Sequence, residues 1–96
     1  RFHPLAQREL LRAARYYDTR RPGLGDEFLD EIHMVVGRIT VSPEAIAPFD
    51  DALRARLLSR FPYALIYCMG SNAAIIVAVA HNSRRQGYWR RRRKKP

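Results

Sequence analysis

The sequence is poor in cysteine, in long apolar runs and, in its second half, in acidic residues. The single cysteine, Cys68, excludes an intramolecular disulfide and a cysteine metal cluster, and it fits a reducing compartment. No apolar run approaches the roughly 20 residues that span a bilayer, so we expect a cytoplasmic protein with no membrane partner. At 96 residues and 47% hydrophobic content, we expect one globular domain over residues 1–96.

Acidic residues end at Asp51, whereas basic residues gather at the C-terminus. Residues 84–96 hold eight of the 18 lysines and arginines and no acid, which leaves the rest of the chain nearly neutral. Such a basic extension favours a polyanionic partner, although it can also be a solvated tail. We expect residues 84–89 to stay beside the last strand, and residues 90–96 to extend into solvent because their charges repel one another.

The first half of the sequence has the periodicity of two helices. Residues 4–17 gather apolar side chains in one sector and place three arginines opposite, where we expect a solvated face. Residues 26–40 repeat the pattern after a turn rich in glycine and proline, and the short link predicts an antiparallel hairpin. The expected inward side chains are Ala6, Leu10, Ala13, Tyr17, Phe28, Ile32, Val35 and Ile39.

The second half changes to the two-residue alternation of strands, over residues 53–60, 63–69 and 73–80. Residues 1–3 could be the end of a truncated first strand. The sequence therefore predicts an α+β fold, in which a two-helix antiparallel hairpin packs on one face of a small, mostly antiparallel sheet. The order is strand-helix-helix-strand-strand-strand.

In the last of these strands, large and small side chains alternate. We expect Ile75, Val77 and Val79 to face the helices and smaller residues to lie on the opposite face. That second face would be shallow, so it could hold a ligand or receive a terminal segment.

Short segments in a characteristic order resemble the RelE/ParE toxin superfamily of type II toxin–antitoxin systems over nearly the whole chain. The resemblance implies toxicity and growth inhibition by the unbound protein, plasmid stabilization, and neutralisation by a cognate antitoxin in a hetero-oligomer. The segments are Phe2-His3-Pro4 with Ala6 and Glu9, Tyr16-Tyr17, Leu24-Gly25 with Phe28, Ser42-Pro43, Arg60-Phe61-Pro62-Tyr63 with Ile66-Tyr67, and Val79-Ala80-His81 leading to Arg84-Arg85 and Tyr88-Trp89-Arg90.

The superfamily has two branches, and fold alone does not separate them. RelE-like members cut messenger RNA in the ribosome, and ParE-like members poison DNA gyrase. RNA cleavage needs a base, an acid and a cation for the phosphate, for which His81, Arg84 and Tyr88 are the candidates. The side chains expected to bind the target or nucleic acid are Arg54, Arg56, Arg60, Arg84, Arg85, Trp89 and Arg90.

Two features of the sequence weigh against RNA cleavage. Ribonuclease members tend to place a basic residue after the aromatic that aligns with Tyr63, and here that residue is Ala64. No carboxylate base follows Asp51, and His81 could equally be a strand-end histidine bonded to backbone. We therefore favour ParE-like inhibition of gyrase over a metal-independent, ribosome-dependent mRNA endoribonuclease. A nucleic-acid-binding module that acts through its basic tail is the third reading.

Cofactors are not expected. The three histidines, His3, His33 and His81, lie far apart and lack metal-ligand spacing. The glycines before the second helix lack the strand and the further glycine of a phosphate-binding loop. We expect neither a metal nor an organic cofactor.

Overall fold

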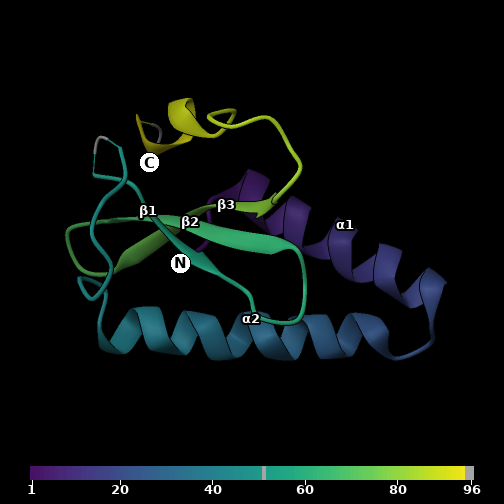
Figure 1. Ribbon diagram of the computed structural model, residues 1–96. Coiled ribbons are helices and arrows are strands. Elements are labelled where there is room, and N and C mark those ends of the chain that lie inside the picture. The colour runs from purple at the N-terminus through teal and green to yellow at the C-terminus, as the bar shows by residue number, and fades with distance from the viewer. Residues whose placement is uncertain (51, 95–96) are drawn as a thin grey trace.

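The computed structural model describes residues 1–50 and 52–94 and confirms an α+β architecture (Figure 1). Two long helices come first, three strands follow, and a short 3₁₀ helix ends the described chain. The elements are α1 (Pro4–Arg20), α2 (Leu24–Val41), β1 (Arg54–Leu57), β2 (Tyr63–Met69), β3 (Ala74–His81) and η1 (Arg90–Lys94). Both helices are a few residues longer than the sequence pattern indicated.

Local chemistry explains where the two helices begin. Pro4 is the first residue of α1, and the Nδ1 atom of His3 accepts the Leu5 N–H at 3.1 Å. The link to α2 turns at Gly23, whose φ of 87° suits glycine. Two residues further along, the helices touch at Gly25, where a Cβ atom would collide with the carbonyl oxygen of Ala14. Glycine at this position therefore allows the close approach of α1 and α2.

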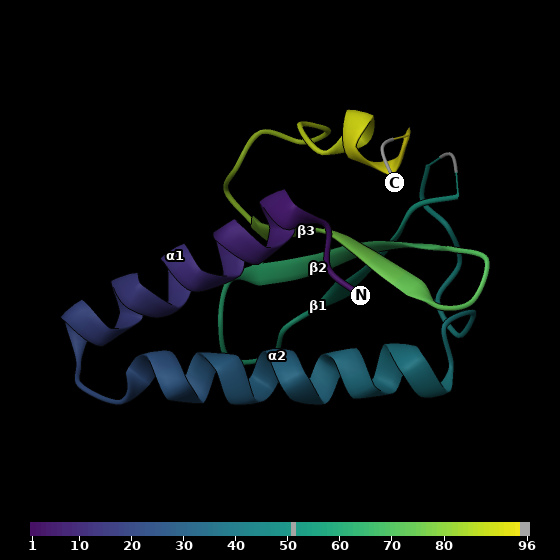
Figure 2. The ribbon, with the colours of Figure 1, turned by 180° about the vertical axis from the view of Figure 1, so that it is seen from behind.

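The helical hairpin opens like a V away from its turn, and the sheet lies in the opening (Figures 1 and 2). Helix α2 runs along one face of the sheet, while α1 slants toward β3. The sheet has the order β1-β2-β3, and both pairings are antiparallel. The expected first strand is present only as a bridge, in which Phe2 lies parallel to Ile76 of β3.

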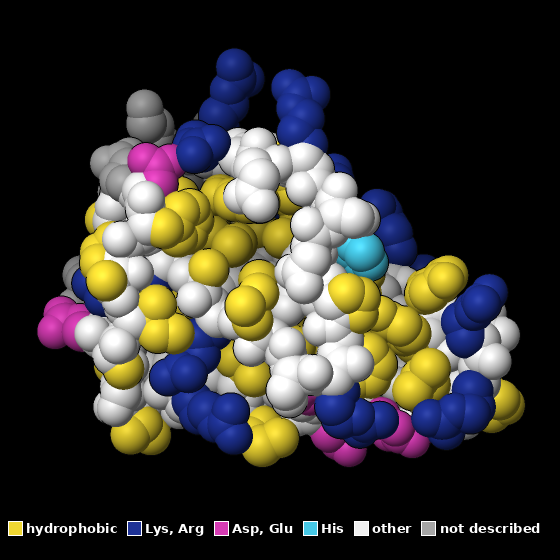
Figure 3. Space-filling model, in the orientation of Figure 1, with side chains coloured by type: hydrophobic (Ala, Val, Ile, Leu, Met, Phe, Trp, Pro, Cys, Tyr) yellow, Lys and Arg dark blue, Asp and Glu magenta, His cyan; other side chains and the backbone are white. Residues whose placement is uncertain are grey.

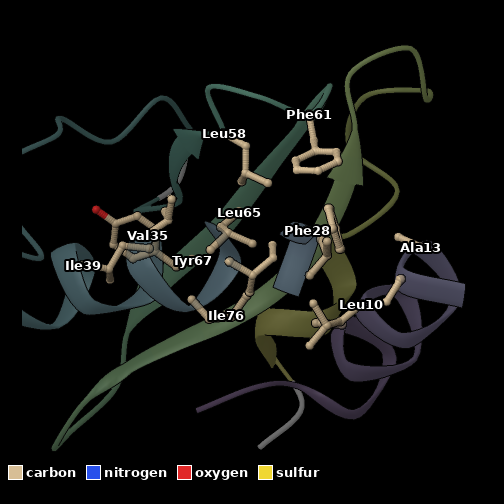
Figure 4. Close-up of a cluster of buried hydrophobic side chains, with 14 residues drawn as sticks. Leu10, Ala13, Phe28, Val35, Ile39, Leu58, Phe61, Leu65, Tyr67 and Ile76 are labelled. Atoms are coloured by element: carbon tan, nitrogen blue, oxygen red, sulfur yellow. The ribbon is translucent and has the colours of Figure 1, made fainter. Parts of the chain in front are cut away.

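The helix-side face of the sheet forms the larger core (Figure 4). Phe28, Ile32 and Val35 of α2 pack there against Leu65 and Tyr67 of β2. The rings of Tyr17, Phe28, Phe61 and Tyr63 meet at centroid distances of 4.9 to 6.3 Å, mostly edge to face. Apolar burial therefore holds this face together.

The predicted orientation of β3 is wrong for two of its three large residues. A register irregularity between Ile66 and Tyr67 of β2 inserts one extra residue into β3. Val79 does face the helices, but Ile76 joins it there, whereas Ile75 and Val77 point to the opposite face. Strict alternation could not anticipate this bulge, because the period of two holds only while the ladder is regular.

The opposite face of the sheet, hereafter the open face, receives the C-terminal segment, as the sequence suggested it could. Trp89 is only 4% exposed and packs with Ile66, Val77 and Ala78. The expectation that residues 90–96 extend into solvent is wrong for Arg90–Lys94, which fold back as η1. Lys95 and Pro96 lie outside the described residues. The segment folds back although its charges repel one another, because carboxylates from distant parts of the chain pair with Arg90 and Arg92.

Candidate functional site

Two hollows meet at His81 and Arg84, at the end of β3. The first, hereafter the sheet groove, has a volume of about 380 Å³ and lies on the open face. Its walls include Leu57 of β1, Ile66 of β2 and Trp89. Figure 3 shows hydrophobic side chains in this hollow, with arginine side chains projecting beyond it.

The second hollow, hereafter the tyrosine cleft, has a volume of about 350 Å³ and lies between α1 and the end of β3. Arg12, Tyr16 and Tyr17 of α1 form one wall, and Tyr63 of β2 contributes to the other. The three arginines opposite the apolar sector of α1 are exposed, as expected, and one of them, Arg12, borders this cleft.

Glu9 forms the ion pair that fixes the C-terminal segment, with both side chains nearly buried at 11% and 12% exposure. Arg92 donates from Nη1 to Oε1 at 3.0 Å and from Nη2 to Oε2 at 3.1 Å. The backbone N–H of Val79 donates to the same Oε1 atom at 2.9 Å, and Arg92 also donates to the carbonyl oxygen of Val77 at 3.0 Å. The two side chains thus satisfy backbone groups at the outer edge of β3, so the Glu9 carboxylate is already fully engaged.

The His81 side chain is hydrogen-bonded to its neighbour Ser83. Its Nδ1 atom accepts the backbone N–H of Ser83 at 3.1 Å and lies 2.8 Å from the Ser83 hydroxyl oxygen. A backbone N–H can only donate, so Nδ1 is unprotonated and the neutral ring carries its proton on Nε2. The Nδ1 atom of His81 is thus already engaged as a hydrogen-bond acceptor.

Tyr88 lies between two arginines. The guanidinium of Arg84 is 4.0 Å from the ring centroid and that of Arg92 is 5.0 Å away. Burial, followed by the charge of Glu9, raises the pKa of Tyr88 to about 12. At neutral pH the hydroxyl is therefore protonated and can donate a hydrogen bond, but it cannot act as a base.

The predicted binding arginines of the middle of the chain lie apart from the C-terminal ones. Arg54 donates to the carbonyl oxygen of Ile46 at 2.6 Å, and Arg56 borders a shallow hollow over the end of α2. Arg60 pairs with Glu27 of α2 at 2.7 Å. Arg54 and Arg56 lie opposite Tyr67 and Leu65 in the β1–β2 register, so their side chains lie on the helix side of the sheet. Arg60 lies on the same side because it pairs with α2.

The C-terminal candidates divide into exposed and engaged groups. Arg84 is 52% exposed and only loosely paired with Glu9 at 3.8 Å, and Arg85 is exposed. Arg90 forms an ion pair with Asp50, with Nε 2.7 Å from Oδ2. The Trp89 ring is buried against the sheet. Arg84 and Arg85 are therefore the cations best placed beside His81 to meet a partner.

Sequence reasoning did not single out the Glu9–Arg92 pair or Asp50. One signal was available: Glu9 is the one acidic residue in the arginine-rich first 17 residues. Its partner could not be named, because Arg92 is one of eight basic residues in the C-terminal stretch. Within residues 1–50 and 52–94, no three histidine, cysteine, aspartate or glutamate side chains gather as metal ligands.

Comparison with known proteins identifies the family of this chain. No helix in the described part of the chain is long and apolar enough to cross a membrane. A search among curated proteins gave no match. The model of the family described as ParE toxin of type II toxin-antitoxin system, parDE, matches residues 1–86, from the bridge at Phe2 through the end of β3 to Arg84 and Arg85. The chain therefore belongs to the ParE toxin family, and it is the toxin component of a type II toxin–antitoxin system.

Proposed function

We propose that this toxin inhibits DNA gyrase by binding it in the cytoplasm, without catalysing a reaction of its own. The supporting observation is that Glu9 and His81 are already engaged in other contacts and that Tyr88 cannot act as a base. Glu9 is paired with Arg92, Nδ1 of His81 accepts the Ser83 N–H, and the Tyr88 hydroxyl is held protonated. Arginines with no available base beside them suit recognition of an anionic surface better than RNA cleavage.

The target is tested with purified toxin in two assays, gyrase supercoiling and cleavage of ribosome-bound messenger RNA. We expect inhibition of supercoiling and intact message. Exposed Arg84 and Arg85 are the proposed contacts, so Arg84→Gln/Arg85→Gln should weaken inhibition, whereas His81→Ala should leave growth arrest largely unchanged at matched expression. Cleavage of message with supercoiling unaffected would refute the proposal.

Ribosome-dependent RNA cleavage is the second candidate, because His81 and Arg84 stand side by side where the two hollows meet. In that case His81→Ala should cost roughly 10²–10⁴-fold in rate, as expected for a lost acid–base group. Retained growth arrest in His81→Ala would exclude this role.

Family membership implies an antitoxin partner. We propose that an acidic antitoxin segment covers part of the open face and the basic side chains at its rim. Arg84, Arg85 and Arg90 are all exposed there, so association should slow as ionic strength rises. An association rate that is equal at low and physiological salt would contradict this electrostatic attraction.

A further inference from the structure

The tyrosine cleft is lined by an unbroken row of aromatic rings that the proposed inhibition of gyrase does not use. Tyr16 and Tyr17 lie 5.4 Å apart, Tyr17 and Tyr63 lie 6.3 Å apart, and Tyr63 lies 5.0 Å from His81. The row therefore crosses the cleft from α1 to the end of β3. Tyr16, at 52% exposure, presents the most open ring.

The tyrosine cleft also favours negative charge. Arg12 and Arg84 border it and are both exposed. The acidic residue in its lining, Glu9, is neutralised by the two contacts from Arg92. An anionic group in the cleft would therefore meet the exposed guanidinium groups of Arg12 and Arg84, of which Arg84 also contacts the Tyr88 ring and is loosely paired with Glu9. It would meet no unpaired carboxylate among the lining residues.

A ligand that uses both features must carry a planar ring and an anionic group. Stacking on aromatic side chains together with arginine contacts to phosphate is how proteins hold nucleotides without reading their sequence. The volume of about 350 Å³ lies at the lower end of the range for small-molecule sites, which suits one nucleotide. An acidic peptide would satisfy the arginines but would leave the row of rings without a stacking partner.

We propose that the tyrosine cleft binds one nucleotide unit, with its base against the row of rings and its phosphate between Arg12 and Arg84. The nucleotide could be unattached or part of a single strand, since both present the same base and phosphate. This inference does not depend on gyrase being the target, because nucleotide binding is measured in the absence of gyrase.

The test titrates the full chain with thymidine 5′-monophosphate, thymidine, inorganic phosphate and an oligothymidylate of about eight nucleotides. Tyrosine ring resonances and calorimetry report binding. We expect the monophosphate to bind more tightly than thymidine or phosphate alone. Arg12→Gln and Tyr16→Ala should each weaken its binding about tenfold. Arg15→Gln is the matched control, because Arg15 is exposed on the same helix but does not border the tyrosine cleft.

The oligonucleotide separates the two sources of the ligand. Equal affinity for the monophosphate and the strand would support an unattached nucleotide, and much tighter binding of the strand would support single-stranded nucleic acid. Three results would overturn the proposal: equal weakening by Arg12→Gln and Arg15→Gln, equal affinity for phosphate and the monophosphate, or stronger perturbation of the same rings by a short polyglutamate peptide. The altered residues are exposed, so circular dichroism is expected to show intact folding in each variant.

Discussion

The two faces of the sheet are covered in different ways. Helices α1 and α2 cover one face and bury a continuous apolar core around Phe28 and Tyr67. The open face is only partly covered, by a short segment in which Trp89 supplies apolar contact and Arg90 and Arg92 form ion pairs. Apolar burial is the main contact at the first face, whereas one apolar ring and a few ion pairs position the segment on the second.

Two carboxylates with little solvent exposure, Glu31 of α2 and Glu9 of α1, are satisfied differently. Glu31 of α2 is 6% exposed and accepts hydrogen bonds from the Ser59 N–H, the Ser59 hydroxyl and the Arg60 N–H. These donors are neutral, and they tie α2 to the turn between β1 and β2. Glu9 instead depends on the charge of Arg92. Loss of one partner should therefore lower the free energy of unfolding more at Glu9 than at Glu31.

The largest effect is expected from Phe28→Ala, in the centre of the helix-side core. Phe28 is fully buried and contacts three other aromatic rings, so truncation should lower the free energy of unfolding by about 3–5 kcal/mol through transfer and cavity terms. Urea denaturation followed by circular dichroism measures it. Met34→Ala on the exposed side of α2 is the control and should change it by less than about 0.5 kcal/mol. A small effect at Phe28 would mean that the helix-side core is not the main source of stability.

The second-largest loss of stability is expected when the Glu9–Arg92 pair is broken. Glu9→Gln should cost about 3 kcal/mol, because it leaves the guanidinium of Arg92 nearly buried without its counter-charge. It should also release the C-terminal segment while the helices persist. Emission of Trp89, the single tryptophan, should then shift to the red before the helical signal is lost.

A double-mutant cycle with Arg92→Gln isolates this pair. The double variant should be more stable than the sum of the two single losses implies, because the uncompensated charge is removed. Arg90→Gln is the control at a more exposed pair and should cost less than about 1 kcal/mol. Additive effects of the Glu9 and Arg92 changes would contradict the direct coupling.

The smallest predicted effect is the contribution of Glu31 to the pH dependence of stability. Burial alone would raise the pKa of Glu31, but the hydrogen bonds from Ser59 and Arg60 outweigh it and hold the pKa below its usual value. Because the folded pKa is lowered, this stabilisation is fully present above the unfolded pKa of about 4.3. It is lost as pH falls through the folded pKa.

Glu31→Gln keeps the shape of the side chain and removes the charge. It should reduce stability by about 1–2 kcal/mol at neutral pH and lose less stability than the parent below about pH 4. Urea midpoints between acid and neutral pH measure the difference. A difference between the two proteins that stays constant over the whole range would show that the Glu31 charge does not contribute.

Much of the candidate site could be located from the sequence, because its residues are adjacent in the chain. His81 is the last residue of β3, and Arg84 and Tyr88 follow within seven residues, so their closeness follows from local geometry. Arg54 and Arg56 are different: the strand was predicted, but its helix-side orientation depends on pairing with β2. Glu9 reaches the site across more than 80 residues of sequence, and no local pattern selects Arg92 as its partner.

Periodicity by itself determined two helices, three strands and their order, because burying apolar side chains imposes a repeat of 3.6 or 2 residues on the sequence. The tertiary structure decided what depends on specific long-range contacts. The bulge at Val77 placed Ile75 and Val77 on the open face instead of the helix side. The carbonyl oxygen of Val77 accepts a hydrogen bond from Arg92. Glu9 and Asp50 neutralised Arg92 and Arg90, so a segment whose charges repel folds onto the sheet instead of extending. Composition shows that these charges exist, but only the folded chain brings opposite charges within contact distance.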